Sequence, residues 1–176
     1  MKYLMLACLV STSLLTGCAA TVERGGSDTI SIAQASKQNL AVTFKGNDKV
    51  VANEDWGLLQ RTWANSLQAE AALVGYRVTE TSTVPAPQPG VLMQVNVSNF
   101  RFLSPGARFG AGVMTGNAWV NSSVDFVDMK SGNKLGTRTY NTTSSAWEGV
   151  MSAMTEKQVQ AIAKQIIADI KAAKAE

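Results

Sequence analysis

The residue with the most distinctive chemistry in this chain of 176 residues is Cys18, whose thiol follows a short apolar segment. Lys2 precedes the apolar run 3–10, and residues 14–17 lead directly into the cysteine. One basic residue, a short apolar stretch and small residues before a cleavage point are typical of a secretory signal, and this stretch is too short to span a bilayer as a helix. We therefore expect residues 1–17 to be a signal peptide whose removal leaves Cys18 as the first residue.

The run Leu15-Thr16-Gly17-Cys18 resembles the lipobox of bacterial lipoproteins. This resemblance implies that the thiol receives a diacylglyceryl group and that the acyl chains (palmitate or a similar fatty acid) hold the protein on a membrane. Each buried methylene contributes about 0.8 kcal/mol, so two or three chains together make release negligible. The next residue is Ala19, not the Asp that typically retains lipoproteins in the inner membrane. We expect the periplasmic face of the outer membrane, with the external face of the inner or cell membrane as the alternative.

Histidine is absent from the whole sequence. This absence removes the usual general base of hydrolases and the commonest metal ligand, and Cys18 is committed to its lipid. We therefore expect no catalytic residues, no metal, no cofactor and no enzymatic activity. The alternative is a His-independent envelope hydrolase, for which Asp125, Arg138 and Tyr140 would have to line one cleft.

The charges of the mature chain are nearly balanced, because removal of Lys2 reduces 16 basic side chains to 15 against 13 acidic ones. No cluster of basic residues with interleaved aromatic residues is found, so nucleic acid is not an expected partner. Cys8 leaves with the signal peptide and Cys18 carries lipid, which excludes a disulfide within one chain. The fold must rely on packing alone.

Two short motifs imitate known sites. The run 110–116 approaches a dinucleotide fingerprint, but its third glycine, Gly116, comes one residue late and a strand, not a helix, is expected after it. Ser131 and Lys134 match the Ser-x-x-Lys spacing of penicillin-binding enzymes, yet they fall in an expected hairpin turn without the companion motifs. Turn formation explains the second motif better.

The glycine-rich segment 105–116 is a candidate contact loop. It carries Phe109, Val113 and Met114 and leads to Trp119. Its simplest interpretation is a flexible loop between strands. The alternative is an adhesive patch for a membrane or a partner, because exposed apolar side chains are what such a patch offers.

Hydrophobic periodicity predicts strands and helices along the rest of the chain. Residues 18–38 are rich in small and polar types and predict a flexible linker after the lipidated cysteine. The helix that begins near residue 53 places Trp56 and Trp63 on one face, which is more typical of a core than of a ligand site. The predicted strands cover 40–44, 76–80, 91–97, 117–129 and 135–147, and a second helix covers about 155–170. Near 98–99 the alternation slips, which indicates either a bulge or the end of the strand.

This order predicts an α+β fold, namely a mainly antiparallel sheet with two amphipathic helices packed on one face. The antiparallel expectation rests on the hairpin turn at 130–134, which joins two long alternating strands. Residues 39–176 are expected to form a single periplasmic domain, since this length suits one core.

From the lipobox to the closing helix, the chain resembles bacterial lipoproteins with domain of unknown function 4410. The resemblance covers roughly residues 38–172 and includes the helix end at Gly75-Tyr76-Arg77-Val78 and the turn sequence 128–135. It implies a binding, accessory or scaffolding role in the cell envelope and an envelope protein or glycan as partner. We expect the polar Asn, Ser and Thr face of the sheet, or the candidate contact loop, to hold that partner.

Overall fold

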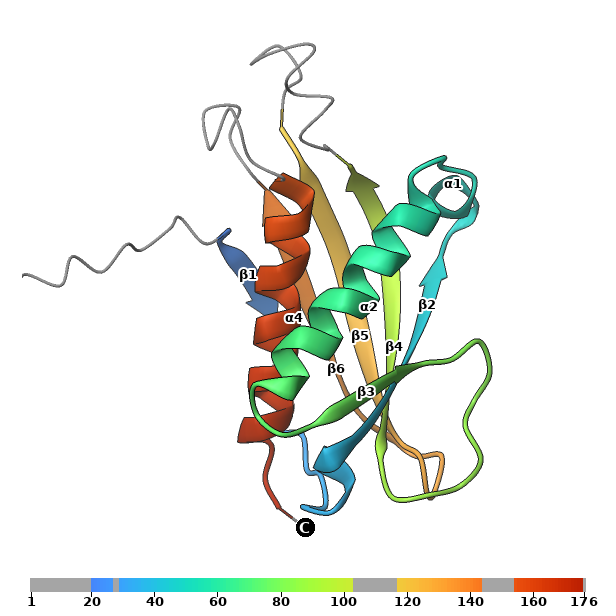
Figure 1. Cartoon of the computed structure of the whole chain (residues 1–176), viewed down its shortest axis with the longest axis vertical. Coiled ribbons are helices and arrows are strands. Elements are labelled where there is room, and N and C mark those ends of the chain that lie inside the picture. Colours follow the sequence, from blue (N-terminus) through green and yellow to red (C-terminus); the bar gives the residue numbers. More distant parts are fainter. Residues whose placement is uncertain (1–19, 27–28, 103–116, 144–153, 176) are drawn as a thin grey trace, which may run out of the picture.

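The computed structural model describes residues 20–26, 29–102, 117–143 and 154–175. Cys18, Phe109, Val113 and Met114 lie outside these residues. Figure 1 shows the arrangement of the helices and strands. The elements are β1 (Val22–Gly25), η1 (Ser36–Gln38), β2 (Asn39–Gly46), α1 (Asp48–Val51), α2 (Trp56–Ala72), β3 (Arg77–Glu80), β4 (Val91–Arg101), β5 (Trp119–Asp128), β6 (Lys134–Thr143) and α4 (Met154–Ala172).

The described strands form one six-stranded sheet in the order β1-β6-β5-β4-β2-β3. The pairs β1–β6, β6–β5 and β5–β4 are antiparallel, whereas β4–β2 and β2–β3 are parallel. The α+β class is confirmed, but the expectation of a mainly antiparallel sheet is wrong because the sheet is mixed. The cause is the long connection through α1 and α2, which returns the chain to pair β3 in parallel with β2.

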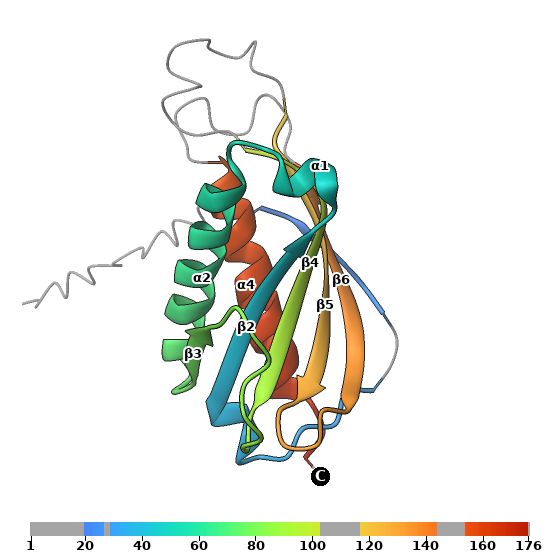
Figure 2. The same cartoon turned by 90° about the vertical axis from the view of Figure 1, so that its right-hand side faces the viewer.

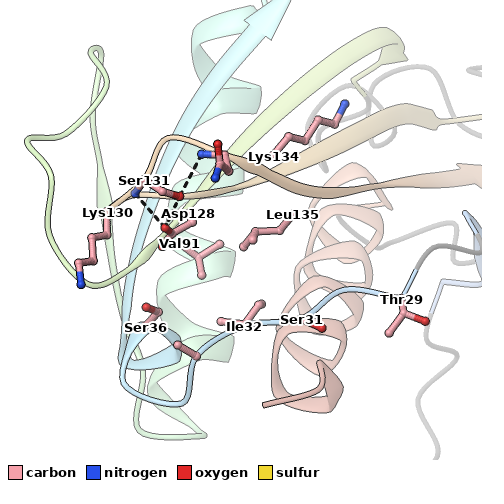
Figure 3. Close-up of a pocket in the computed structure, with 12 residues that line it drawn as sticks. Thr29, Ser31, Ile32, Ser36, Val91, Asp128, Lys130, Ser131, Lys134 and Leu135 are labelled. Carbon is pink, nitrogen blue, oxygen red and sulfur yellow. Dashed lines mark hydrogen bonds between the residues drawn. The ribbon is translucent and has the colours of Figure 1, made fainter. Parts of the chain in front are cut away.

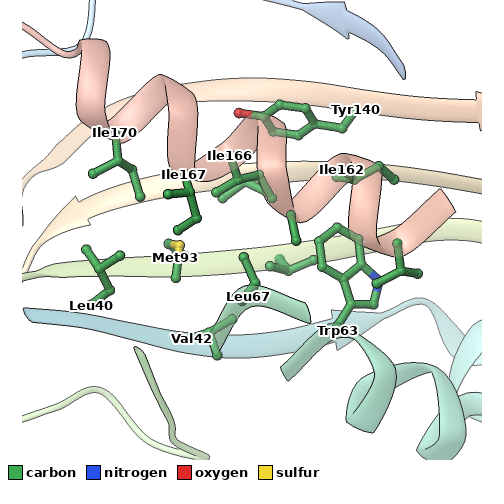
Figure 4. Close-up of a cluster of buried hydrophobic side chains, with 14 of the residues drawn as sticks. Leu40, Val42, Trp63, Leu67, Met93, Tyr140, Ile162, Ile166, Ile167 and Ile170 are labelled. Carbon is green, nitrogen blue, oxygen red and sulfur yellow. The ribbon is translucent and has the colours of Figure 1, made fainter. Parts of the chain in front are cut away.

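Both long helices lie on one face of the sheet, as Figure 2 shows. α2 and α4 pack against each other and close a single main core over the strands. Trp63 has no exposed surface and belongs to the same buried cluster as Leu67, Met93 and Ile166 (Figure 4). Trp56 is half-buried, and the centroid of its ring lies 6.3 Å from the ring centroid of Phe100. The prediction that both tryptophans belong to the core is confirmed for Trp63, and Trp56 packs against the core from a partly buried position.

The alternation of β4 explains why one face of the sheet is apolar. Val91, Met93, Val95 and Val97 are buried under the helices, and the polar residues between them are partly exposed. The register between β4 and β5 shifts between Val97 and Asn99 while β4 continues to Arg101, so the slip is a bulge and not the end of the strand. The shift lets Phe100 return to the core.

The N-terminal part of the described chain is ordered, so the predicted linker over 18–38 is wrong for residues 22–25 and 30–38. β1 pairs with β6 at the edge of the sheet, and Ile30 and Ile32 are buried in the main core. Lys37 is also buried, and its Nζ donates hydrogen bonds to the carbonyls of Lys171 (3.2 Å) and Ala173 (2.7 Å). A buried ammonium at a helix C-terminus satisfies carbonyls that have no partner within the helix.

Candidate functional site

The sheet face opposite α2 and α4 carries rows of polar side chains that remain at least partly exposed. Asn96, Ser123 and Thr139 form one row across β4, β5 and β6, because these residues are register partners. The full set, here called the polar sheet face, is Lys45, Gln94, Asn96, Ser98, Asn121, Ser123, Asp125, Thr137, Thr139 and Asn141.

Asp125 is the one carboxylate of the polar sheet face. Its Oδ1 accepts hydrogen bonds from Thr137 Oγ1 at 2.6 Å and forms an ion pair with Lys134 Nζ at 2.7 Å. Partial burial alone would raise the pKa of Asp125, but the hydrogen bonds from Lys134 and Thr137 and the charge of Lys134 outweigh this effect, so the pKa lies below its usual value. A carboxylate held ionised in this way anchors neighbouring donors and is poorly suited to act as a general acid.

A shallow depression of about 550 Å³ lies at one end of the polar sheet face. Its lining comes from β2, β4, β5 and β6 and from the residue before α1. Asn47 fixes this rim, because its Nδ2 donates to the Ser98 carbonyl at 2.9 Å while its Oδ1 accepts from the Val50 amide at 3.0 Å. The polar side chains around the depression are Lys45, Asn47, Asn96, Ser98, Ser123, Thr139 and Asn141.

The three residues that would have lined a hydrolase cleft are not brought together. Asp125 lies on the polar sheet face, whereas Arg138 and Tyr140 lie two residues apart on the helix-covered face and are buried. Burial raises the pKa of the Tyr140 hydroxyl, and so does its hydrogen bond to Asp169. The cleft that the alternative of a His-independent hydrolase needs is therefore not formed by these three residues. Asp125 pairs with Thr137, and the neighbouring Arg138 points to the opposite face of the sheet.

A second polar pocket, of about 540 Å³, lies between residues 29–36 and the β5–β6 turn (Figure 3). Within it, the Asp128 carboxylate accepts from the Ser131 amide at 2.9 Å and from Ser131 Oγ at 2.6 Å. Lys134 instead pairs with Asp125, so Ser131 and Lys134 do not form the pair that a Ser-x-x-Lys enzyme needs. The prediction that turn chemistry explains this motif is confirmed.

Trp119, the one described member of the candidate contact loop residues, is the first residue of β5. It is half-buried, and the guanidinium carbon of Arg101 lies 5.6 Å from the centroid of its ring. This contact is a cation–π interaction across two neighbouring strands. Phe109, Val113 and Met114 lie outside the described residues, so their role as contact residues stays a prediction.

Two features are absent from the described part of the chain. No helix there is long and apolar enough to cross a membrane. No group of three or more acidic or cysteine side chains there could hold a metal ion.

Sequence reasoning missed Arg24, Lys37 and Asp169, which tie the N-terminal segment to α4. Arg24 Nε donates to Asp169 Oδ2 at 2.8 Å, and the two residues are 145 positions apart. Arg24 and Lys37 fall in the range that we expected to be a linker. Asp169 is one of the polar residues of an amphipathic helix. The local sequence carries no signal for a partner at such a separation.

The sequence matches no family model and no curated protein. The resemblance to domain of unknown function 4410 is therefore not confirmed. Solved structures nevertheless share the fold. A point variant of PelC from Paraburkholderia phytofirmans, described as a dodecamer, is 15% identical and has a TM-score of 0.52 over 87% of this chain and 98% of that chain.

A second PelC dodecamer structure from the same organism is 14% identical, with a TM-score of 0.50 over 89% of this chain and 99% of that chain. A lipoprotein from Neisseria meningitidis is also 14% identical, with a TM-score of 0.41 over 74% of this chain and 98% of that chain. At these identities, the PelC structures show a shared fold.

Proposed function

We propose that this chain is a lipid-anchored protein of the bacterial envelope that holds a partner on its polar sheet face. Cys18 is the proposed anchor, and the periplasmic face of the outer membrane is the proposed location. The role is binding, accessory or scaffolding and is not enzymatic. The observation that carries the proposal is the asymmetry of the sheet, since α2 and α4 cover one face while the other presents polar side chains.

The chemistry of the polar sheet face suits hydrogen-bonded recognition. Amide and hydroxyl side chains such as Asn96, Ser123 and Asn141 can both donate and accept, as do peptide groups and sugar hydroxyls. The single carboxylate, Asp125, is already paired with Lys134, so the face has little net charge to offer a highly charged ligand. An envelope protein or a glycan is the class of partner that this surface fits.

In-cell photo-crosslinking tests the proposal. A photoreactive amino acid at Ser123 or Asn141 should give a discrete adduct in the native membrane. The same group at Gln68, an exposed residue of α2, is the matched control and should give none. Equal labelling from both faces, or adducts from Gln68 alone, would contradict the proposed binding face.

The candidate contact loop extends the same proposal. Phe109, Val113 and Met114 are apolar residues that a passive linker does not need. Replacing Phe109 and Met114 with Ser should preserve folding and reduce the yield of the Ser123 adduct. Loss of folding in this double variant would instead place the segment in the core.

A second copy of this chain is the other candidate partner. The PelC structures that share the fold are dodecamers. In this chain β3 pairs only with residues 39–42 of β2, although β2 continues to Gly46. Residues 43–46 of β2 therefore have no pairing with β3 on that side. A free strand edge can pair with another chain. The crosslinking experiment separates the two cases, since a homo-oligomer gives an adduct of twice the monomer mass.

A further inference from the structure

The distance between the proposed lipid anchor and the folded domain is short. Only three residues separate Cys18 from Val22, the first residue of β1. Even a fully extended chain spans at most about 14 Å over this step. The headgroup layer on each side of a bilayer is roughly 5 to 7 Å thick, so β1 must stay close to the lipid surface. This step rests on the proposed function, because it needs the lipid at Cys18.

α4 lies directly beside β1. Arg24 of β1 and Asp169 of α4 form an ion pair at 2.8 Å, and Tyr140 of the adjacent strand β6 donates to the same carboxylate oxygen at 2.7 Å. Figure 1 shows β1 beside α4, and β1 is the edge strand of the sheet. A short tether at β1 therefore keeps the outward side of α4 and the adjoining part of the polar sheet face within reach of the membrane.

The outward side of α4 is basic. Lys157, Lys164 and Lys171 are exposed and seven residues apart, which places them along one side of the helix. The described residues contain no ion pair that neutralises any of these three ammonium groups. Of the acidic residues in α4, Glu156 lies at the helix start and Asp169 is paired with Arg24.

The polar sheet face beside β1 has a different character. Glu23 of β1 pairs with Asn141 of that face, and Gly25 of β1 pairs with Thr139. Neutral amides and hydroxyls beside a carboxylate gain nothing electrostatically from an anionic surface. A lysine close to an anionic bilayer is attracted, and this attraction acts over a Debye length of about 8 Å at physiological salt.

We infer that the outward side of α4, with Lys157, Lys164 and Lys171, rests on the anionic headgroups of the membrane to which Cys18 is anchored. The polar sheet face then points away from that membrane, where a partner can reach it. The short tether supplies proximity, and the three lysines select which side of the domain is turned to the lipid. The surface recognised is phosphate of anionic phospholipid in a bilayer.

The test uses the full lipidated protein, extracted from membranes and reconstituted into vesicles of phosphatidylethanolamine with or without phosphatidylglycerol. A single cysteine is introduced for an environment-sensitive fluorophore, at Ala168 between the lysines or at Thr139 on the polar sheet face. Thr139 is a matched control, because both probe positions lie next to β1. Thr139 pairs with Gly25 of β1, and Ala168 is adjacent to Asp169, which pairs with Arg24 of β1. A quencher attached to lipid headgroups reports proximity.

We expect stronger quenching at Ala168 than at Thr139 on anionic vesicles, and a smaller difference on neutral vesicles or at 1 M salt. Each lysine near the surface should bias the orientation by roughly fivefold. The double change Lys164→Glu and Lys171→Glu should therefore abolish the difference. Lys45→Glu, a single charge reversal of the same kind on the polar sheet face, should preserve it.

Two outcomes would overturn the inference while leaving the anchor intact. One is equal quenching of the two probes on anionic vesicles, and the other is a difference that does not respond to the lysine substitutions. Flotation with vesicles and the mass of the mature N-terminus measure the anchor separately. A mature chain without lipid at Cys18 would contradict the proposed function, and the tether argument would fail with it.

Discussion

The hydroxyl of Tyr140 donates a hydrogen bond of 2.7 Å to the Asp169 carboxylate, which joins the sheet to α4 inside the protein. Tyr140 has no exposed surface, and the Asp169 side chain is only 9% exposed. The same carboxylate accepts from Arg24 of β1, so one acidic group holds two strands and a helix. A hydrogen bond to a charged acceptor in such a setting contributes more than one between neutral groups.

Tyr140→Phe removes this hydrogen bond and preserves the packing of the ring. We expect the free energy of unfolding to fall by about 1.5 to 3 kcal/mol, the range for hydrogen bonds to charged groups. Urea denaturation measures the change. Tyr76→Phe is the control, since Tyr76 is only half-buried, and it should change stability little. Equal effects of the two substitutions would contradict the role given to the Tyr140–Asp169 contact.

The same contact predicts a loss of stability in alkali. The folded state raises the pKa of Tyr140 above the ordinary value of 10.0, chiefly through burial. The protonated hydroxyl is therefore favoured by folding, and its contribution is complete below about pH 10 and declines as the pH rises further. Denaturation between pH 9 and 11.5 should show this decline in the parent, and Tyr140→Phe should show a shallower one. Identical slopes would contradict the assignment.

Lys37→Met should destabilise the C-terminal turn of α4. The substitution preserves most of the apolar stem but removes the buried ammonium. The carbonyls of Lys171 and Ala173 then lose the hydrogen bonds that Lys37 donates to them. We expect a loss of about 1 to 3 kcal/mol and faster hydrogen exchange at the end of α4. Lys164→Met, on the exposed side of the same helix, should stay within about 0.5 kcal/mol of the parent.

Trp63→Ala should be the most destabilising single change among those considered, because Trp63 is fully buried in the main core. Truncation of a large aromatic core residue costs about 3 to 5 kcal/mol. Trp56→Ala should cost less, since Trp56 is half-buried. Thermal melts of both variants test the order. A Trp63→Ala variant that melts like the parent but loses its partner would assign this residue to binding.

Cys18→Ser should leave an unprocessed or soluble precursor, because the serine hydroxyl cannot replace the thiol in thioether formation. Metabolic labelling with a fatty acid analogue, followed by fractionation of membranes, measures the effect. The parent should carry label and sediment with membranes. Label retained in the Cys18→Ser variant would place the lipid elsewhere.

Periodicity predicted the elements that contribute most to the core. The alternation of β4 and the helical spacing of Trp56 and Trp63 both report which side of an element is buried, and the structure confirms both. Periodicity does not report which strands are neighbours. The parallel pairs β2–β4 and β2–β3 depend on where α2 returns the chain, so the mixed sheet could not be predicted this way.

The N-terminal segment shows a second limit of the sequence. β1 has four residues and its burial alternates only weakly, and residues 30–38 have the small and polar composition of a linker. Their order comes from partners that are distant in the chain, as with Lys37 and the end of α4. The polar residues of the sheet face could be predicted from the alternation of residue types. The depression could not, because part of its rim is Asn47, which lies outside the strands.

The placement of β1 has a consequence for the order in which the chain folds. β1 and the segment with Lys37 are synthesised well before their partners β6 and α4. Contacts at this sequence separation carry a high cost in loop-closure entropy and slow the folding of a domain. β1 must therefore stay unpaired until β6 is available, and during that interval its edge is open to chaperones and to misassociation.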